Sequence, residues 1–294
     1  MESTSIMYRL KLVIANTLIP VARGWIRYSP ILIGKKWLWQ HFSWRLKNFE
    51  CRTIFGSQVT GNTKDLIQSY LYYFGVWEPR ITKWINDSLT DGDTFIDVGA
   101  NIGYYSLLAS KRVGSRGKVV AIEAAPWIYD IALKHLELNA CNNVRALSVA
   151  ASHEKGLVRI YPGSEDNIGN TTIVPREGNS FEIQALPICD ILLEEEILSI
   201  RIIKIDVEGA ELQVVKGMIP ILPRLKKNAE ILIEILTPQP EIFSIMYAHG
   251  YSAFVINSNY SARSYMFETK ESRPVHLPVE SEYGGDIIFS KMNY

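Results

Sequence analysis

From residue 94 onward, short runs rich in β-branched and aliphatic residues alternate with stretches of helical periodicity. We expect strands at Thr94–Val98 and at residues 118–122, 144–149, 200–205 and 229–235. Strands joined by crossover helices form a parallel sheet that is covered on both faces. The pattern therefore predicts an α/β fold with a doubly wound, mostly parallel sheet. Helices are expected at 66–74, 79–89, 104–111, 128–139, 211–217 and 241–248, and further strands at 253–256 and 286–289.

The composition changes along the chain and predicts that it is divided into segments. Residues 1–52 hold nine basic and two acidic residues and four of the seven tryptophans, whereas the rest of the chain holds 22 basic and 29 acidic residues. The formal net charge of zero is thus a sum of +7 and −7. We expect a helical N-terminal arm at 1–52, a helical entry segment at 53–90 and the α/β domain at 91–294, with a β-rich insertion at about 156–190.

The arm is basic, rich in tryptophan and amphipathic. Apolar residues recur at helical spacing from Ile6 to Val21. Such a composition is typical of a helix that lies in a membrane interface. A helical arm packed on its own domain has the same periodicity, so both interpretations remain open.

Several broad classes are disfavoured by composition. The neutral charge balance argues against a nucleic-acid binder, and no histidine or cysteine cluster has metal-ligand spacing, so we expect neither partner. Cys51, Cys141 and Cys189 are widely spaced and odd in number, which favours reduced thiols and a cytoplasmic location. We predict neither a signal peptide nor a membrane span, and at most peripheral association with the inner face of a membrane. We interpret the acidic run 194–196 as a solvated helix face rather than a cation site.

A glycine turn follows the first predicted strand of the α/β domain. It contains Asp97, Gly99, Ala100, Asn101 and Gly103. In an open parallel sheet, ligands bind at the carboxyl ends of the strands, and glycine lets the backbone approach them closely. Asparagine occupies the position of the second glycine in the dinucleotide fingerprint, so a pyrophosphate would lack room. The turn therefore favours a smaller ligand with an amino-acid head and an adenosine.

Two carboxylates accompany this turn. Asp97 at the end of its strand could accept hydrogen bonds from an ammonium group. Glu123 ends the next strand, twenty residues after Gly103, where an acidic residue can bind both ribose hydroxyls. The alternatives are a turn cap for Asp97 and a solvated carboxylate for Glu123.

A third group of ionisable residues ends the strand predicted at 200–205. Lys204, Asp206 and Glu208 alternate, so we expect them on one face of an extended segment. Three ionisable groups at the end of a central strand indicate a functional site. A structural ion pair of Lys204 with Asp206 or Glu208 is the alternative.

Four motifs together resemble a known family. DVGANIG at 97–103 and IKIDVEGAE at 203–211, with FGVWEP at 74–79 and ILIEI at 231–235, are similar to the FkbM-type methyltransferases. The resemblance covers about three quarters of the chain and excludes the arm. It implies an S-adenosylmethionine-dependent O-methyltransferase with the class I Rossmann-like fold.

The resemblance also implies roles for individual residues. S-adenosyl-L-methionine is the implied cofactor. Asp206 and Glu208 would lie beside the sulfonium and the acceptor, and Ala150 to Ser152 beside the adenine. The residues implied to hold the methionine part and the ribose are Asp97, Gly99, Asn101, Gly103 and Glu123.

The expected reaction is methyl transfer to a hydroxyl of a sugar, glycan or secondary metabolite. Methyl transfer from a sulfonium is an in-line displacement, so positioning supplies much of the acceleration. A hydroxyl acceptor also needs a base, for which Asp206, Glu208 and Lys204 are the candidates. His135 and His153 are interpreted as packing or surface residues. Two alternatives are a nicotinamide-dependent oxidoreductase and a non-catalytic membrane-surface module.

Overall fold

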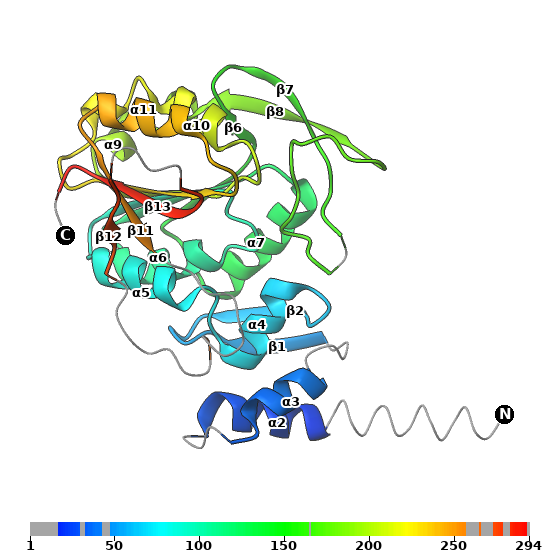
Figure 1. Cartoon of the computed structure of the whole chain (residues 1–294). Coiled ribbons are helices and arrows are strands. Elements are labelled where there is room, and N and C mark those ends of the chain that lie inside the picture. Colours follow the sequence, from blue (N-terminus) through cyan, green and yellow to red (C-terminus); the bar gives the residue numbers. More distant parts are fainter. Residues whose placement is uncertain are drawn as a thin grey trace. The chain divides into compact units, whose positions relative to one another are not determined.

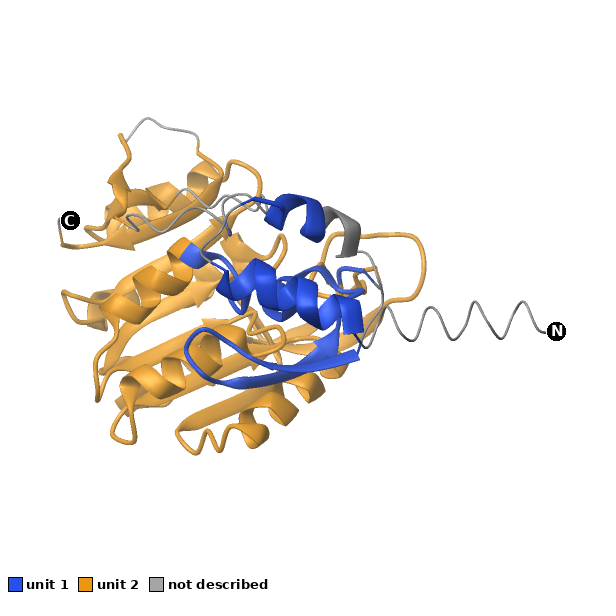
Figure 2. Cartoon of the chain, turned by 90° about the horizontal axis from the view of Figure 1, so that it is seen from below, with its two compact units in different colours: residues 1–79, 165–167, 259–270 blue, residues 80–164, 168–258, 271–294 orange. Residues whose placement is uncertain are grey.

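The computed structural model describes residues 17–29, 33–42, 48–164, 166–256, 265, 273–278 and 283–292. The periodicity predicted for residues 6–16 of the arm lies outside these ranges. The chain forms two compact units (Figure 2). Unit 1 comprises residues 1–79, 165–167 and 259–270, and unit 2 comprises residues 80–164, 168–258 and 271–294.

Unit 1 combines helices with a β-hairpin. The hairpin pairs β1 with β2, so it joins residues on both sides of position 52, where we expected the arm to end. Helix α4 begins after Asp65, whose carboxylate accepts a hydrogen bond of 2.9 Å from the Gln68 N–H, and it ends at Gly75 with φ 74°. The elements of unit 1 are α2 (Ile19–Tyr28), α3 (Lys35–Phe42), β1 (Asn48–Arg52), β2 (Gln58–Asn62) and α4 (Leu66–Phe74).

Unit 2 is built on a mostly parallel sheet. Among the described residues, eight strands form it in the order β12-β11-β13-β10-β9-β3-β4-β5. Strands β10, β9, β3, β4 and β5 are parallel, and β13 runs antiparallel between β10 and β11. The strands are β3 (Thr94–Val98), β4 (Lys118–Glu123), β5 (Val144–Ser148), β9 (Ile200–Ile205), β10 (Glu230–Ile235), β11 (Ser252–Ile256), β12 (Val275–His276) and β13 (Gly285–Ser290).

Helices cover both faces of this sheet, as the sequence pattern predicts. Helices α6 and α7 pack on β3, β4 and β5, whereas α10 and α11 lie on the other face (Figure 1). Leu138, within the helix predicted at 128–139, is exposed, whereas Ile128, Ala132, His135 and Leu136 are buried. The helices are α5 (Pro79–Ser88), α6 (Tyr104–Val113), α7 (Pro126–Leu138), α8 (Ile188–Ile191), α9 (Glu194–Ile197), the 3-10 helix η2 (Leu222–Arg224), α10 (Glu211–Met218) and α11 (Pro240–Ala248).

The strand order places a topological switch point between β3 and β9. From β3 the chain continues outward to β4 and β5, and it then returns to β9 on the other side of β3. In open α/β sheets, ligands bind outside the carboxyl ends of the strands at such a switch point, which here are the ends of β3 and β9.

The insertion forms a small second sheet. Strand β8 (Phe181–Pro187) pairs antiparallel with β7 (Gly156–Ile160) and parallel with β6 (Ala150–Ser152). The third predicted strand, 144–149, thus ends at Ser148, and residues 150–152 belong to a different sheet. The β-rich character predicted for the insertion is confirmed, but the pairing of β6 with β8 links residues too distant for local patterns to reveal.

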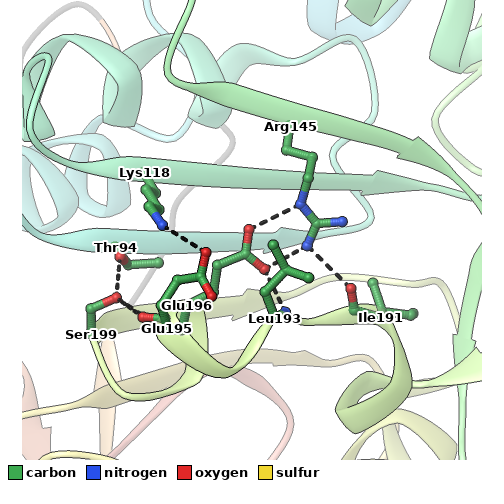
Figure 3. A network of polar contacts seen from close by, with 8 residues as sticks. All are labelled: Thr94, Lys118, Arg145, Ile191, Leu193, Glu195, Glu196 and Ser199. Atoms are coloured by element: carbon green, nitrogen blue, oxygen red, sulfur yellow. Dashed lines mark hydrogen bonds and ion pairs between the residues drawn. The ribbon is translucent and has the colours of Figure 1, made fainter.

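The acidic run of α9 is only partly solvated. Glu194 and Glu195 are exposed, as predicted, but Glu196 is buried and accepts hydrogen bonds from Arg145 Nε at 2.9 Å and from the Leu193 N–H at 2.8 Å (Figure 3). The interpretation as a solvated face is therefore wrong for Glu196, which fixes α9 to β5. A cavity of about 730 Å³ adjoins this pair at the amino ends of β4 and β5, the sheet edge away from the glycine turn.

Candidate functional site

The glycine turn lies at the carboxyl end of β3 and approaches the end of β9 closely. Gly99 has φ +80°, and a Cβ atom there would lie 1.8 Å from the Asp206 carbonyl oxygen. The Gly99 and Ala100 N–H groups both donate to the Ile122 carbonyl oxygen at 2.9 Å. Asn101 adopts φ 50°, a left-handed conformation that asparagine tolerates better than most residues. The turn is thus held against both neighbouring strands and requires glycine at position 99.

Glu123, at the end of β4, supports the same turn. Its Oε2 accepts the Asn101 N–H at 2.8 Å and its Oε1 accepts the Ala125 N–H at 2.9 Å. Burial raises the pKa of Glu123 to about 7, although these two N–H groups favour the ionised form. Each carboxylate oxygen retains a further lone pair. Glu123 can therefore order the turn and still accept two hydroxyl groups from a ligand.

Asp97 is buried inside the end of β3. Its Oδ2 accepts a hydrogen bond of 2.6 Å from the Ser106 hydroxyl, whereas its buried Oδ1 has no hydrogen-bond partner. Burial raises the pKa of Asp97 to about 6, opposed by the positive charge of Lys204 on the neighbouring strand. A buried acceptor without a donor is costly in free energy. Oδ1 is thus an atom that a bound ammonium group would satisfy.

Lys204 and Asp206 form an ion pair at the end of β9. The Nζ of Lys204 lies 2.7 Å from Asp206 Oδ2, and it also lies 5.0 Å from the centre of the Tyr105 ring. Burial alone would raise the pKa of Asp206, but Lys204 and a side-chain hydrogen bond with Glu234 hold it below its usual value. The structural ion pair considered for these residues is therefore present.

Glu208 departs from the predicted extended segment. Strand β9 ends at Ile205, and Glu208 has φ 52°, so the alternation expected for Lys204, Asp206 and Glu208 on one extended face is wrong at Glu208. The cause is the turn that leads into α10 through Gly209, which has φ 104°. Partial burial, with the nearby carboxylates of Asp206 and Glu211, raises the pKa of Glu208 to about 7.

The insertion reaches this turn. The Thr172 hydroxyl donates a hydrogen bond to the Glu208 carbonyl oxygen, and a Cβ atom at Gly209 would lie 3.2 Å from Val174. Arg176, two residues further on, favours the ionised form of Glu208 through its charge. The insertion therefore forms one wall around Glu208.

Two further carboxylates lie in this region, and the sequence patterns do not predict a role for them. Glu234 in β10 hydrogen-bonds with Asp206, and Asp286 in β13 lies opposite Glu234 in the strand register. The ILIEI motif contains Glu234 within an otherwise apolar strand. A carboxylate in a central strand is itself a signal of function, because such positions are normally apolar.

The remaining candidates occupy less central positions. Ala150 and Ala151 are buried in β6, which contacts β4, the strand that carries Glu123; their place beside an adenine stays a prediction. His135 is fully buried, with Nδ1 2.8 Å from the Ile102 carbonyl oxygen, and His153 is exposed next to Glu154. Both histidines thus have the packing and surface positions predicted for them.

The arrangement defines a class of protein. A seven-strand core with β13 antiparallel between β10 and β11, and a glycine turn and acidic residue ending β3 and β4, are the features of a class I S-adenosylmethionine-dependent methyltransferase. Two acceptor groups at this place fit the cofactor: Asp97 Oδ1 has no hydrogen-bond donor in the fold, and the Glu123 carboxylate has lone pairs available.

Comparison with known proteins identifies the family. The model of the methyltransferase FkbM domain matches residues 97–260, more than half of the chain, and the chain therefore belongs to the FkbM methyltransferase family. The predicted resemblance is thus confirmed, and neither the nicotinamide-dependent alternative nor a non-catalytic module is favoured.

Individual relatives are methyltransferases as well. Methyltransferase sdnD of Sordaria araneosa is 28% identical over 201 residues, covering 56% of this chain and 75% of sdnD. Hexuronic acid methyltransferase AglP of Haloferax volcanii is 28% identical over 141 residues, covering 48% of this chain and 56% of AglP. The crystal structure of methyltransferase FkbM from Methylobacillus flagellatus KT is similar with a TM-score of 0.42 and 15% identity, covering 76% of this chain and 54% of that chain.

Proposed function

We propose that this methyltransferase transfers the methyl group of S-adenosylmethionine to a hydroxyl oxygen of a sugar, glycan or other small secondary metabolite. The name of AglP, a hexuronic acid methyltransferase, supports a sugar as acceptor. The insertion that surrounds Glu208 supports an acceptor bound beside the carboxyl end of β9. We propose a small molecule or glycan rather than a nucleic acid.

The cofactor is proposed to bind across the ends of β3 and β4. Asp97 would accept from its ammonium group and Glu123 from its ribose hydroxyls, while Ala150 and Ala151 would border the adenine. When bound, the cofactor supplies a methyl group on a positively charged sulfur. The residues proposed to form the turn around its methionine part are Gly99, Ala100, Asn101 and Gly103.

Glu208 is proposed as the general base. The observation that carries this role is its position in the turn after β9, where Thr172 of the insertion donates to its carbonyl oxygen and Val174 packs against Gly209. Its pKa, raised to about 7, supports the role because a base works best when its pKa lies near the working pH. Asp206 is less basic, since Lys204 and Glu234 lower its pKa. Lys204 donates a hydrogen bond to Asp206, so it is proposed to hold the Asp206 carboxylate in place rather than to accept a proton.

The test is Glu208→Gln, assayed with tritiated S-adenosylmethionine against hexuronic acid and hexose glycosides and a fractionated metabolite extract. We expect kcat to fall by about 10²–10⁴-fold with cofactor affinity unchanged. The wild-type rate should rise with pH up to about 7, and the variant should lose this dependence.

Glu154→Gln, at an exposed position, is the matched control and should keep full activity. Methyl transfer by Glu208→Gln at the wild-type rate would show that Glu208 is not the base. Label incorporated only into RNA would contradict the proposed acceptor class.

A further inference from the structure

Helix α2 has two separate apolar faces. Ile19, Ala22 and Ile26, spaced i, i+3 and i+7, are buried within unit 1. A second set with the same spacing stays exposed on the neighbouring face of the helix and continues into the turn and helix that follow. We name this set the arm stripe, and it consists of Leu18 (47% exposed), Val21 (67%), Trp25 (41%), Tyr28 (71%), Ile33 (84%) and Trp37 (61%).

The buried face of α2 is fixed by arginines as well as by apolar contacts. Arg23 Nε donates to the Tyr72 carbonyl oxygen at 2.6 Å, and its guanidinium lies 4.8 Å from the centre of the Tyr72 ring. Arg27 Nη2 donates to the Arg52 carbonyl oxygen at 2.7 Å. These contacts set the rotation of α2 about its axis, so the arm stripe is held outward by the fold.

The arm stripe is continuous between α2 and α3. Trp25 Nε1 donates to the Ile33 carbonyl oxygen at 3.3 Å, which brings the end of α2 to the turn before α3. The two tryptophans of α3 lie in different environments. Trp39 packs 5.0–5.1 Å from the rings of Tyr70, Tyr73 and Phe74, whereas Trp37 is exposed.

We propose that the arm stripe docks on the surface of an anionic lipid bilayer. Contiguous exposed apolar side chains are uncommon on monomeric proteins and mark interaction sites. Tryptophan and tyrosine have an apolar body and a polar end, which suits the boundary between headgroups and acyl chains. This inference goes beyond the methyl-transfer function and does not depend on the acceptor.

The distribution of charge along the chain favours an anionic bilayer as the partner of the arm stripe. Residues 1–52 carry a formal charge of +7, and the remaining residues carry −7. Basic segments are attracted to anionic headgroups, and the same headgroups would repel the acidic remainder of the chain. The membrane would therefore be met by the arm rather than by the rest of the chain. None of the described helices is long and apolar enough to span a bilayer. The proposed contact is that of an amphipathic helix lying in the membrane interface.

The experiment is co-sedimentation of the full chain with vesicles of phosphatidylcholine alone and of phosphatidylcholine mixed with phosphatidylserine. The test variant is Val21→Glu with Ile33→Glu. The matched control is Ile54→Glu with Leu198→Glu, which makes the same change in net charge at exposed apolar positions outside the arm stripe. Thermal unfolding and sedimentation velocity of each protein without lipid check folding and oligomeric state.

We expect the wild type to bind the anionic vesicles, with weaker binding at high salt and on neutral vesicles. The test variant should bind at least about tenfold more weakly, whereas the control should keep most of the binding. Absence of wild-type binding, or equal losses in test and control variants, would overturn the proposal. So would a wild-type dimer that the test variant dissociates without any vesicle binding, because a second copy would then cover the arm stripe.

Discussion

Gly99 is the residue at which the site depends most directly on the absence of a side chain. Its φ of +80° is unfavourable for other residues, and an added Cβ atom would collide with the Asp206 backbone rather than with a flexible side chain. The close approach of the β3 and β9 ends is therefore a backbone property. This contact explains why position 99 holds glycine. Position 101 has a φ of 50°, which asparagine also adopts.

Gly99→Ala should lower the free energy of unfolding by about 2–4 kcal/mol and abolish cofactor binding. Alanine is strained at the φ of +80°, and its Cβ atom would collide with the Asp206 carbonyl oxygen. Chemical denaturation and calorimetry measure the two effects. Gly156→Ala is the control: nothing lies within 4 Å of its added Cβ, and we expect little change in either quantity. Wild-type stability and binding in Gly99→Ala would contradict the geometry of the turn.

Buried carboxylates should make the ligand-free protein less stable as pH rises. Burial raises the pKa of Glu123 from 4.5 to about 7, so between these values the folded state holds a proton that the unfolded state has released. Stability is then highest below pH 4.5 for this group and falls as pH increases to about 7, by on the order of 3 kcal/mol. Asp97, with a pKa of about 6, and Glu208, with a pKa of about 7, act in the same direction.

Urea denaturation at intervals from pH 4.5 to 8 measures this dependence, and Glu123→Gln should make it shallower. A wild-type stability that rises steadily across the range would show that these carboxyl groups are ionised in the ligand-free fold.

The sequence identified these carboxylates and offered the Lys204–Asp206 ion pair as one alternative, but it did not reveal their other partners. Asp97, Glu123 and Asp206 could be found because each ends a strand of apolar residues. The role of Glu123 in holding the Asn101 N–H could not, because it depends on a hydrogen bond between two loops. Likewise, the bond between Asp206 and Glu234 joins side chains of two different strands.

At the scale of elements, strands and helices of the α/β domain follow their sequence patterns closely. Strand β9 spans the predicted residues because apolar residues dominate the segment that ends at Ile205. Its continuation to Glu208 was mispredicted, since alternation of residue types does not reveal a positive φ. The pairing of β6 with β8 was also beyond local patterns, because parallel partners are selected by tertiary packing.

Helix α9 is fixed by a buried ion pair of Glu196 and by exposed ion pairs of Glu194 and Glu195; Figure 3 shows the pairs of Glu195 and Glu196. Glu196 binds Arg145 from within the fold, whereas Glu195 binds Lys118 at 3.2 Å on the surface. Glu196→Ala should lower the free energy of unfolding by about 2–3 kcal/mol, because the partly buried Arg145 loses its carboxylate partner and keeps only the hydrogen bond to the Ile191 carbonyl oxygen. Glu195→Ala should cost less than about 1 kcal/mol. Urea denaturation compares the two, and equal effects would contradict the distinct burial of the pairs.

At the scale of the molecule, the neutral net charge conceals a separation of charge along the chain. The acidic α/β domain contains the carboxylates of the proposed cofactor site, while the basic charge is concentrated in the arm. The exposure of the arm stripe on α2 could not be read from the sequence, because periodicity identifies an apolar face without saying what covers it. The structure of unit 1 shows that α2 has both a packed face and an exposed one.

The proposed cofactor site combines segments that are far apart in the chain. The ends of β3, β4 and β9 meet only when the sheet is complete, so a ligand that bridges them must stabilise unit 2 as a whole. Cofactor binding should therefore depend on the ends of all three strands together.

Titration calorimetry of S-adenosylmethionine and its demethylated product into the full chain tests this account most directly. We predict that both bind the wild type, and that Glu123→Ala, while still unfolding cooperatively on heating, binds at least about tenfold more weakly through the loss of charged hydrogen bonds. Glu154→Ala should bind like the wild type. A folded wild type that binds neither molecule, or a Glu123→Ala variant with undiminished affinity, would contradict the proposed site.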